Sequence, residues 1–357
     1  MRCKTTTYLD KININNFDFL RVLFAFTVAI AHFIDLSQIE VFKPYSPFFD
    51  SRLAIDGFFI ISGFLIAKSY QNSEGLKNYI IKRIKRIFPA YMLVVCFCAL
   101  FFSFISTNTI DNYFLDKQFW QYLAANLSFQ NYVQPCLPGV FEINKICAVN
   151  GALWTIKIEE AFYLLLPVFY WLVNSKKINI YFLTILSYVI SIIYYNYFLA
   201  IDMYRIGKQL PGAISLFVTG IILFNNFSFF LKHKNLMIIP AVFLFFAEYF
   251  ILNTHILKPF SLGIIIFYIA YSFKFLNHFG KYGDITYGIY IFHFPIIQLF
   301  YYLGFYDSYD PFLSSGLTLG IIIIIAYFSW HYIELPYLSK SRKLRQKNLF
   351  YNKQPKV

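Results

Sequence analysis

The sequence predicts an all-α membrane protein, a polytopic transmembrane helical bundle of about ten helices with both termini in the cytoplasm. Of its 357 residues, 59% are hydrophobic and only 14% are charged, and the mean hydropathy is +0.55. Soluble chains usually have about a quarter of their residues charged. A chain this apolar cannot hide its hydrophobic surface in one water-soluble core, so we expect a bilayer to be its solvent.

Apolar stretches long enough to cross a bilayer recur along the whole chain. A bilayer core requires about 20 apolar residues per helix. Ten stretches are of about this length: 17–36, 52–71, 87–106, 153–173, 179–199, 209–225, 235–253, 257–275, 283–303 and 313–334. Strands of a membrane barrel are shorter and alternate in polarity, so we predict helices. The first stretch is too long for a cleaved signal peptide, and it contains Arg21 and His32.

The positive charges predict the orientation, because Lys and Arg concentrate in cytoplasmic loops of membrane proteins. With the N-terminus inside, 21 of the 31 Lys and Arg residues fall in inner segments and seven in outer ones. The net charge of +13 therefore reflects topology, and we expect no nucleic-acid partner. We predict one transmembrane domain over residues 1–338, followed by a basic cytoplasmic tail over 339–357 that anionic membrane lipid attracts.

Two of the five cysteines, Cys136 and Cys147, share the long outer connection 107–152. They pair if this connection faces an oxidising compartment, and two free thiols are the equal alternative. The remaining cysteines lie at the inner end of a helix or inside one and are expected to be structural: Cys3, Cys96 and Cys98. No spacing typical of metal ligands is present, so we predict no metal site.

Ionisable side chains inside the predicted helices identify the candidate site, because such groups are costly in lipid and usually face a cavity or a partner. Arg21 and His32 are eleven residues apart in the first stretch. At about 100° per residue, they fall within about 20° of one helix face. The alternative is that Arg21 snorkels to the inner surface and that His32 is a core histidine with its hydrogen bonds satisfied.

Two further stretches carry carboxylates. The second contains Asp56, and the fourth contains Glu159 with Tyr163 four residues later on the same face. At a rise of about 1.5 Å per residue, His32, Asp56 and Glu159 lie about 6 to 9 Å below the outer edge. We therefore expect these three to share one layer near the outer face. Helix packing is the alternative for the second stretch, where Gly63 allows a close approach of two backbones.

Basic residues mark the opposite face. Arg83 and Arg86 are three residues apart, which places them on one face of a helix. Guanidinium groups at this spacing suit phosphate recognition, and positive-inside topology is the equal alternative. We expect Arg21 and Glu334 to lie at the same inner face. The arrangement predicts a conduit with a basic inner mouth and an acid/base outer site.

Taken in order, these segments resemble the acyltransferase-3 family of membrane O-acyltransferases, which modify bacterial surface glycans. The resemblance runs from residue 17 to about 338 and rests on FDFLR with AHF, IDGFFIISGFLI, RIKRIFPAYML, LWTIKIEEAFYLLLP, ITYGIYIFHFPI and IELP. The fourth of these motifs is the most specific. One departure is that the family often has Gly around the first-helix Arg, whereas Leu20 and Val22 flank it in this chain.

The resemblance implies an enzyme of the bacterial inner membrane. It would transfer an acyl group, expected to be acetyl, from cytoplasmic acyl-CoA to a hydroxyl of a surface polysaccharide or its lipid-linked precursor. Acyl-CoA would be a co-substrate, with no tightly bound cofactor. On this hypothesis Arg83 and Arg86 hold the donor phosphates. His32 acts as general base or accepts the acyl group itself, and Asp35 or Asp56 orients its imidazole.

The other candidates have supporting roles on the same hypothesis. Glu159 would orient a partner or accept a proton, and Arg21 would stabilise developing negative charge or line the donor path. Three residues are expected to contact substrate: Tyr163, Ser62 and His293. One rival is a transporter or flippase for a lipid-linked sugar, which needs a polar conduit but no acid/base layer. A non-catalytic scaffold is the other rival, and it would gain nothing from buried ionisable groups.

Overall fold

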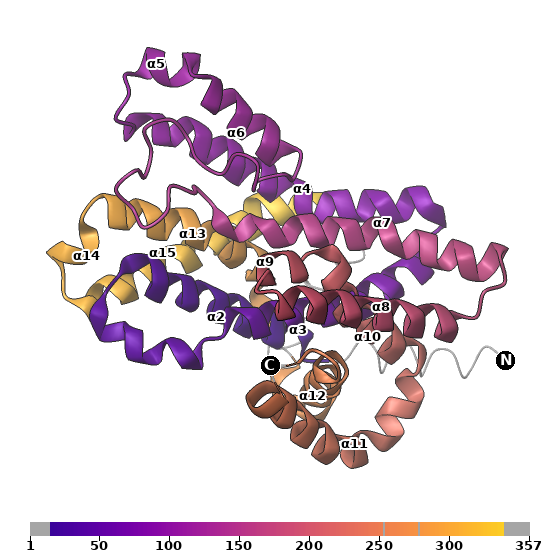
Figure 1. Cartoon of the computed structure of the whole chain (residues 1–357). Helices are drawn as coiled ribbons and strands as arrows, with labels where there is room; N and C mark the ends of the chain where they lie inside the picture. Colours follow the sequence, from indigo (N-terminus) through magenta and orange to yellow (C-terminus); the bar gives the residue numbers. More distant parts are fainter. Residues whose placement is uncertain (1–14, 253, 278, 339–357) are drawn as a thin grey trace, which may run out of the picture. The chain divides into compact units, whose positions relative to one another are not determined.

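The computed structural model describes residues 15–252, 254–277 and 279–338, and within these ranges the chain forms helices and no strand (Figure 1). The all-α prediction is therefore confirmed. The predicted tail over 339–357, and Cys3 with it, lie outside the described residues.

Every one of the ten predicted stretches overlaps a helix. These helices are α2 (Phe17–Ser37), α3 (Ser51–Gln71), α4 (Gly75–Phe101), α7 (Trp154–Ser175), α8 (Ile180–Ala200), α10 (Leu210–Asn225), α11 (Phe227–Ala247), α12 (Lys258–Ser272), α13 (Thr286–Tyr302) and α15 (Pro311–Phe328). Short helical elements occupy much of the remaining chain: η1 (Glu40–Phe48), η2 (Phe102–Phe104), α5 (Ile110–Leu115), α6 (Lys117–Leu127), η3 (Gly151–Leu153), α9 (Tyr204–Gly207), η4 (Glu248–Leu252), η5 (Lys274–Leu276), η6 (Phe279–Tyr282), α14 (Phe305–Ser308), η7 (Ser329–Glu334) and α16 (Leu335–Tyr337).

Six helical segments among the described residues are long and apolar enough to cross a membrane. They are Phe17–Ser37, Ser51–Gln71, Gly75–Phe104, Ile180–Ala200, Phe227–Leu252 and Pro311–Tyr337. Two shorter apolar helices, α10 and α12, accompany them. The chain is thus a multi-pass membrane protein, while the number of ten spans and the orientation of the termini stay predictions.

The outward faces of α8 and α11 show why lipid is needed. Only 11% of the apolar window of α8 and 17% of that of α11 is buried within the protein. Large apolar side chains are exposed along both helices: Phe182, Ile185, Ile193, Ile239 and Phe243. Exposed apolar surface on this scale marks an interaction site, and on two apolar helices long enough to cross a membrane it fits contact with acyl chains.

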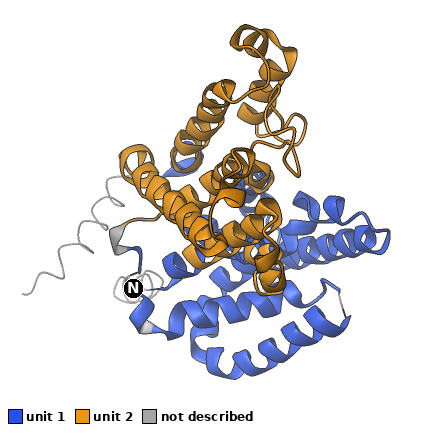
Figure 2. Ribbon diagram, turned by 90° about the vertical axis from the view of Figure 1, so that its left-hand side faces the viewer, with its two compact units in different colours: residues 1–21, 55–80, 158–280 blue, residues 22–54, 81–157, 281–357 orange. Residues whose placement is uncertain are grey.

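The chain forms two compact units whose segments alternate along the sequence (Figure 2). Unit 1 comprises residues 1–21, 55–80 and 158–280, and unit 2 comprises residues 22–54, 81–157 and 281–357. In unit 1, α10 packs against α8 and α12, and α11 packs against α12. Gly63 of α3 lies so close to α10 that a Cβ there would come within 2.0 Å of the Phe217 carbonyl oxygen. The expected close backbone approach at Gly63 is confirmed.

Unit 2 is built around the pair α13 and α15. The connection over 107–152, called the outer connection after the side predicted for it, also belongs to this unit and is partly helical, because it contains α5 and α6. The Thr109 side chain accepts from the backbone N–H of Asn112 at the start of α5, and that of Asp116 accepts from Gln118 N–H at the start of α6. Such caps satisfy amide groups that a helix start leaves open.

Candidate active site

Two histidines from distant parts of the chain meet in unit 2. His32 lies on α2 and His293 on α13, and Nδ1 of His32 is 2.8 Å from Nε2 of His293. The two ring planes are only 7° apart, and their centroids lie 5.1 Å apart, as expected for two imidazoles joined edge to edge by a hydrogen bond. His293 is fully buried, whereas His32 is half-buried. The sequence singled out both residues but did not predict that they touch.

The hydrogen bonds fix which nitrogen carries each proton. Nδ1 of His293 is 3.0 Å from the carbonyl oxygen of Ile289, which can only accept, so Nδ1 is the protonated nitrogen. In a neutral His293 ring, Nε2 then holds a lone pair and accepts from Nδ1–H of His32. A neutral His32 consequently has its own lone pair on Nε2. A charged His293 would place an imidazolium in a fully buried position, which is costly without a counter-ion.

Aromatic and hydroxyl groups surround this pair. The ring of Phe294 meets His32 edge-on, with centroids 5.3 Å apart. The hydroxyl of Tyr290, one turn before His293 on α13, lies 2.6 Å from Thr155 Oγ1. The contact between Tyr290 and Thr155 holds the start of α7 (Trp154–Ser175) against α13. Because His293 is fully buried, its hydrogen bonds are electrostatically stronger than they would be in water.

The outer connection is fastened to α13 close to His293. Nε2 of Gln298 donates to the carbonyl oxygens of Ile146 and Ala148, both at 2.8 Å. Nδ2 of Asn144 donates in return to the backbone oxygen (2.9 Å) and Oε1 (3.0 Å) of Gln298. Nδ2 of Asn150 donates to Ile291 O at 2.7 Å. These amides are not among the residues predicted from the sequence, although Gln298 is a buried polar residue in an apolar helix and signals a partner.

Cys136 and Cys147 form a disulfide within this connection. The sequence left pairing and free thiols equally open, and the structure shows pairing. The disulfide encloses Asn144, so it constrains the segment that Gln298 holds. Cys96 and Cys98 are free thiols on α4, and Cys98 is buried, while their structural role stays a prediction.

The carboxylates expected to orient His32 have other recorded partners. Asp35 accepts from Lys145 Nζ at 2.5 Å in unit 2, and both side chains are about half exposed. Asp56 pairs with Lys258 at 2.8 Å in unit 1, where both side chains are largely buried. The orienting contact that the structure shows for His32 is His293.

Glu159 and Tyr163 meet on α7 in unit 1, as their spacing predicts. The Tyr163 hydroxyl donates to Glu159 Oε1 at 2.5 Å, and the backbone oxygen of Tyr163 accepts from the buried Tyr79 hydroxyl at 3.0 Å. Arg21 and Ser62 are both half-buried, on α2 and α3. Because these residues belong to unit 1 and His32 to unit 2, the shared outer layer stays a prediction.

Arg86 lies at the centre of a buried ionic cluster in unit 2. Its guanidinium donates to Asp284 Oδ2 at 2.7 Å and to Glu334 Oε2 at 3.2 Å. The rings of Tyr287 and Trp330 lie 5.9 and 5.7 Å from its Cζ. The sequence placed Arg86 and Glu334 at one face of the membrane, and the structure brings the two side chains into contact. The Arg86 guanidinium is thus already paired with two carboxylates. Arg83 is half-buried and lies one turn earlier on α4.

The comparison with protein families decides the identity. An acyltransferase domain model matches residues 14–331. The chain belongs to the acyltransferase-3 family. It is therefore an acyltransferase, and the family predicted from six ordered motifs is confirmed.

Several relatives share this assignment. An O-acetyl transferase of Shigella phage Sf6 is 26% identical over 341 residues, covering 92% of this chain and 97% of the relative. A second relative is from Acidianus two-tailed virus, and its name also contains the word acetyltransferase. It is 25% identical over 351 residues, and the match covers 92% of each chain. Nodulation protein 10 of Rhizobium leguminosarum bv. viciae is 29% identical over 162 residues, 43% of each chain. No solved structure matches.

Proposed function

We propose that this enzyme transfers an acyl group, expected to be acetyl, from cytoplasmic acyl-CoA to a hydroxyl of a cell-surface glycan or its lipid-linked precursor. The reaction would take place in the bacterial inner membrane. The observation that carries the proposal is the hydrogen-bonded chain from Ile289 through His293 to His32. It leaves Nε2 of His32 as the nitrogen that can take a proton.

The reaction would begin when Nε2 of His32 removes the proton of the acceptor hydroxyl. The hydroxyl oxygen attacks the thioester carbonyl carbon and forms a tetrahedral intermediate. The carbon–sulfur bond then breaks, and the CoA thiolate takes the proton from the His32 imidazolium. The products are the O-acyl ester and free CoA. Throughout, Nδ1–H of His32 remains bonded to His293, which orients the ring and stabilises its positive charge.

At the donor side, the geometry favours Arg83 over Arg86 as the phosphate ligand. The Arg86 side chain is only 10% exposed, and its guanidinium is bonded to Asp284 and Glu334. A phosphate would have to displace a buried carboxylate to reach it, and this would leave that charge uncompensated. We therefore assign the binding of the donor phosphates to Arg83. Arg86 instead links α4 to Asp284, which precedes α13, and to Glu334, which follows α15.

Two findings support the acceptor side. The phage relative is named an O-acetyl transferase, which favours acetyl as the acyl group and oxygen as the accepting atom. The disulfide Cys136–Cys147 favours an oxidising environment for the outer connection, because disulfides persist there and not in the cytoplasm. The disulfide agrees with an acceptor outside the cytoplasm.

The test is a His32→Ala variant in lipid nanodiscs, compared with His233→Ala on α11 as a matched histidine control. The substrates are acetyl-CoA and the polysaccharide of the host strain, and mass spectrometry follows both CoA release and ester formation. We expect His32→Ala to lower the rate about 10²- to 10⁴-fold and the control to match wild type. Full acetylation by His32→Ala would overturn the base assignment, and no CoA release by wild type would overturn the donor.

A further inference from the structure

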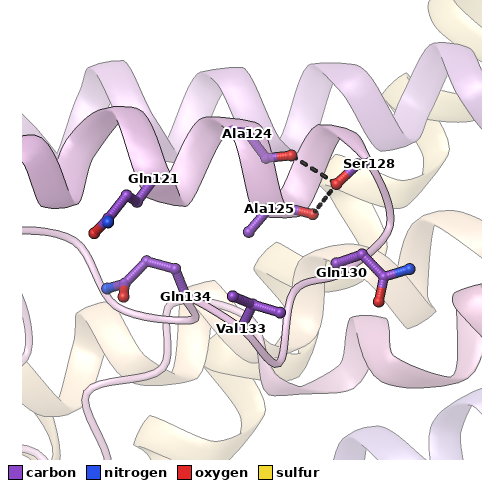
Figure 3. A pocket seen from close by; sticks show the side chains of 7 residues that line it. All are labelled: Gln121, Ala124, Ala125, Ser128, Gln130, Val133 and Gln134. Atoms are coloured by element: carbon purple, nitrogen blue, oxygen red, sulfur yellow. Dashed lines mark hydrogen bonds between the residues drawn. The ribbon is translucent and has the colours of Figure 1, made fainter.

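A pocket of about 380 Å³ lies between α6 and the chain that follows it, away from the histidine pair in sequence (Figure 3). Its lining residues all come from this short segment: Gln121, Ala124, Ala125, Ser128, Gln130, Val133 and Gln134. Ligand pockets usually have volumes of about 300 to 1,000 Å³. The pocket is therefore large enough for one or two sugar rings and belongs entirely to unit 2.

The lining is neutral and rich in amides. Gln121 and Gln134 lie on opposite sides of the hollow, and their amide groups are at the same end of it (Figure 3). Each amide offers both donors and an acceptor. Gln134 Nε2 donates to Cys136 O at 2.9 Å, which fixes the side chain and keeps Oε1 as an acceptor. Such a lining matches the paired donor and acceptor character of sugar hydroxyls and offers no counter-charge to a phosphate.

The pocket also has an apolar side suited to the carbon face of a sugar ring. Ala124, Ala125 and Val133 contribute methyl groups to the lining.

The segment is held in shape without a ligand. The backbone N–H of Gln130 donates to Ala125 O at 2.7 Å, and Nδ2 of the buried Asn126 donates to Gln134 O at 3.1 Å. The Tyr91 hydroxyl of α4 donates to Asn126 O at 2.8 Å. Phe129 has a φ of +60°, a conformation that is strained for a bulky residue and is found often at binding sites. Preorganisation of this kind lowers the entropic cost of binding.

We propose that this pocket is a subsite for a neutral saccharide, which holds the acceptor glycan beyond the sugar being acylated. The role of the pocket in the reaction rests on the proposed function, whereas the binding of a saccharide there does not. The same connection runs from the pocket through the disulfide to Asn144, which is bonded to Gln298 on the helix of His293. A glycan held here would therefore be bound by a segment that is fastened next to the proposed base.

The test measures binding without catalysis. Wild type and an Ala124→Trp variant, whose indole fills the pocket, are prepared in nanodiscs. They are titrated by saturation-transfer NMR with a panel of neutral hexasaccharides built from glucose, galactose, mannose or N-acetylglucosamine. Polyethylene glycol of matched size and an uncharged hexapeptide serve as comparison ligands. Gln121→Ala removes one amide with little risk to folding, and Asn112→Ala on the exposed side of α5 is the matched control.

We expect at least one hexasaccharide to bind to wild type and to Asn112→Ala with equal affinity. The same saccharide should bind at least tenfold more weakly to Gln121→Ala and not measurably to Ala124→Trp. Equal binding to all four proteins, binding of none of the saccharides, or preferred binding of the peptide would each overturn the subsite. Acetyl-CoA cleavage is assayed separately on wild type. A failure of that assay alone would overturn the proposed donor and leave the saccharide site standing.

Discussion

His32 and His293 are joined by a 2.8 Å hydrogen bond between Nδ1 and Nε2, although 261 residues separate them in the sequence. Because Nδ1 of His293 is committed to the Ile289 carbonyl oxygen, the direction of the His32–His293 bond is determined. His293 thus has the position that an orienting carboxylate has in a serine-protease triad, but it is neutral.

Replacing His293 should damage catalysis more than folding. In a His293→Ala variant, Nδ1–H of His32 loses its acceptor, so the ring can rotate or change tautomer. We expect kcat to fall at least about 100-fold. A His293→Gln variant offers Oε1 as a substitute acceptor and should recover part of the loss. Steady-state kinetics with acetyl-CoA, next to thermal unfolding curves, measure both effects. Equal loss in the two variants would argue against the orienting role.

Arg83 and Arg86 should respond differently to the same substitution. Arg86→Ala leaves the carboxylates of Asp284 and Glu334 buried without a counter-charge, which costs about 3–5 kcal/mol. Its expected signature is a lower unfolding temperature and poor accumulation in the membrane. Arg83→Ala should instead raise the KM for acyl-CoA about tenfold or more, since one charge-assisted bond to phosphate is lost. A normal KM in the Arg83 variant would contradict its assignment.

Much of this architecture follows from the sequence, because bilayer thickness and helical periodicity act locally. Stretches of about 20 apolar residues predict membrane helices. Ionisable side chains such as those of His32 and Glu159 are costly in lipid, so their presence in these helices indicates a functional site. The i, i+4 spacing alone was enough to predict the contact between Glu159 and Tyr163.

Partner choice across the fold could not be predicted in the same way. Periodicity gives the face on which Arg86 lies, but Asp284 is 198 residues away and its position depends on how α4 and the start of α13 pack. The same holds for His293 as the partner of His32, where a nearby carboxylate was the simpler expectation. Asn144 and Gln298 are neutral, and a buried amide stands out in an apolar sequence far less clearly than a charge does.

Asn144 and Gln298 should act as one unit. Asn144→Ala removes both bonds from Nδ2 to Gln298, whereas Gln298→Ala removes only the bond to Oε1 and also frees the carbonyls of Ile146 and Ala148. We expect each variant to lower kcat several-fold and the double variant to be little worse than Gln298→Ala, with a coupling energy of about 0.5–3 kcal/mol. A double-mutant cycle on initial rates measures this. Additive losses would show that the two amides act independently.

The disulfide gives a related prediction. Reduction of Cys136–Cys147 releases the segment that carries Asn144, so activity should fall in the presence of a membrane-permeant reductant. A Cys136→Ser, Cys147→Ser double variant should show the lowered activity from the start and no further response to reductant. If reductant lowers the rate of that variant as well, another target is responsible.

The stability of unit 1 should depend on pH through His255, which lies between the end of η4 at Leu252 and the start of α12 at Lys258. Burial, and secondarily the charge of Lys258, lowers the pKa of His255 to about 3 from the ordinary value of 6.5. Below pH 6.5, His255 is therefore protonated in the unfolded chain while it stays neutral in the folded chain. Stability is full above that pH and falls by about 1.4 kcal/mol per unit as pH drops towards 3.

A His255→Phe variant isolates this effect, because it removes the titrating group and retains an aromatic ring for the stack on Tyr195, whose centroid is 4.1 Å away. Between pH 7.5 and pH 5.0, wild type should lose about 2 kcal/mol more stability than the variant. Unfolding temperatures of both proteins at the two pH values give the comparison, and the shared titration of other groups cancels in the difference. Parallel losses in the two proteins would mean that His255 is protonated in the folded state as readily as in the unfolded chain.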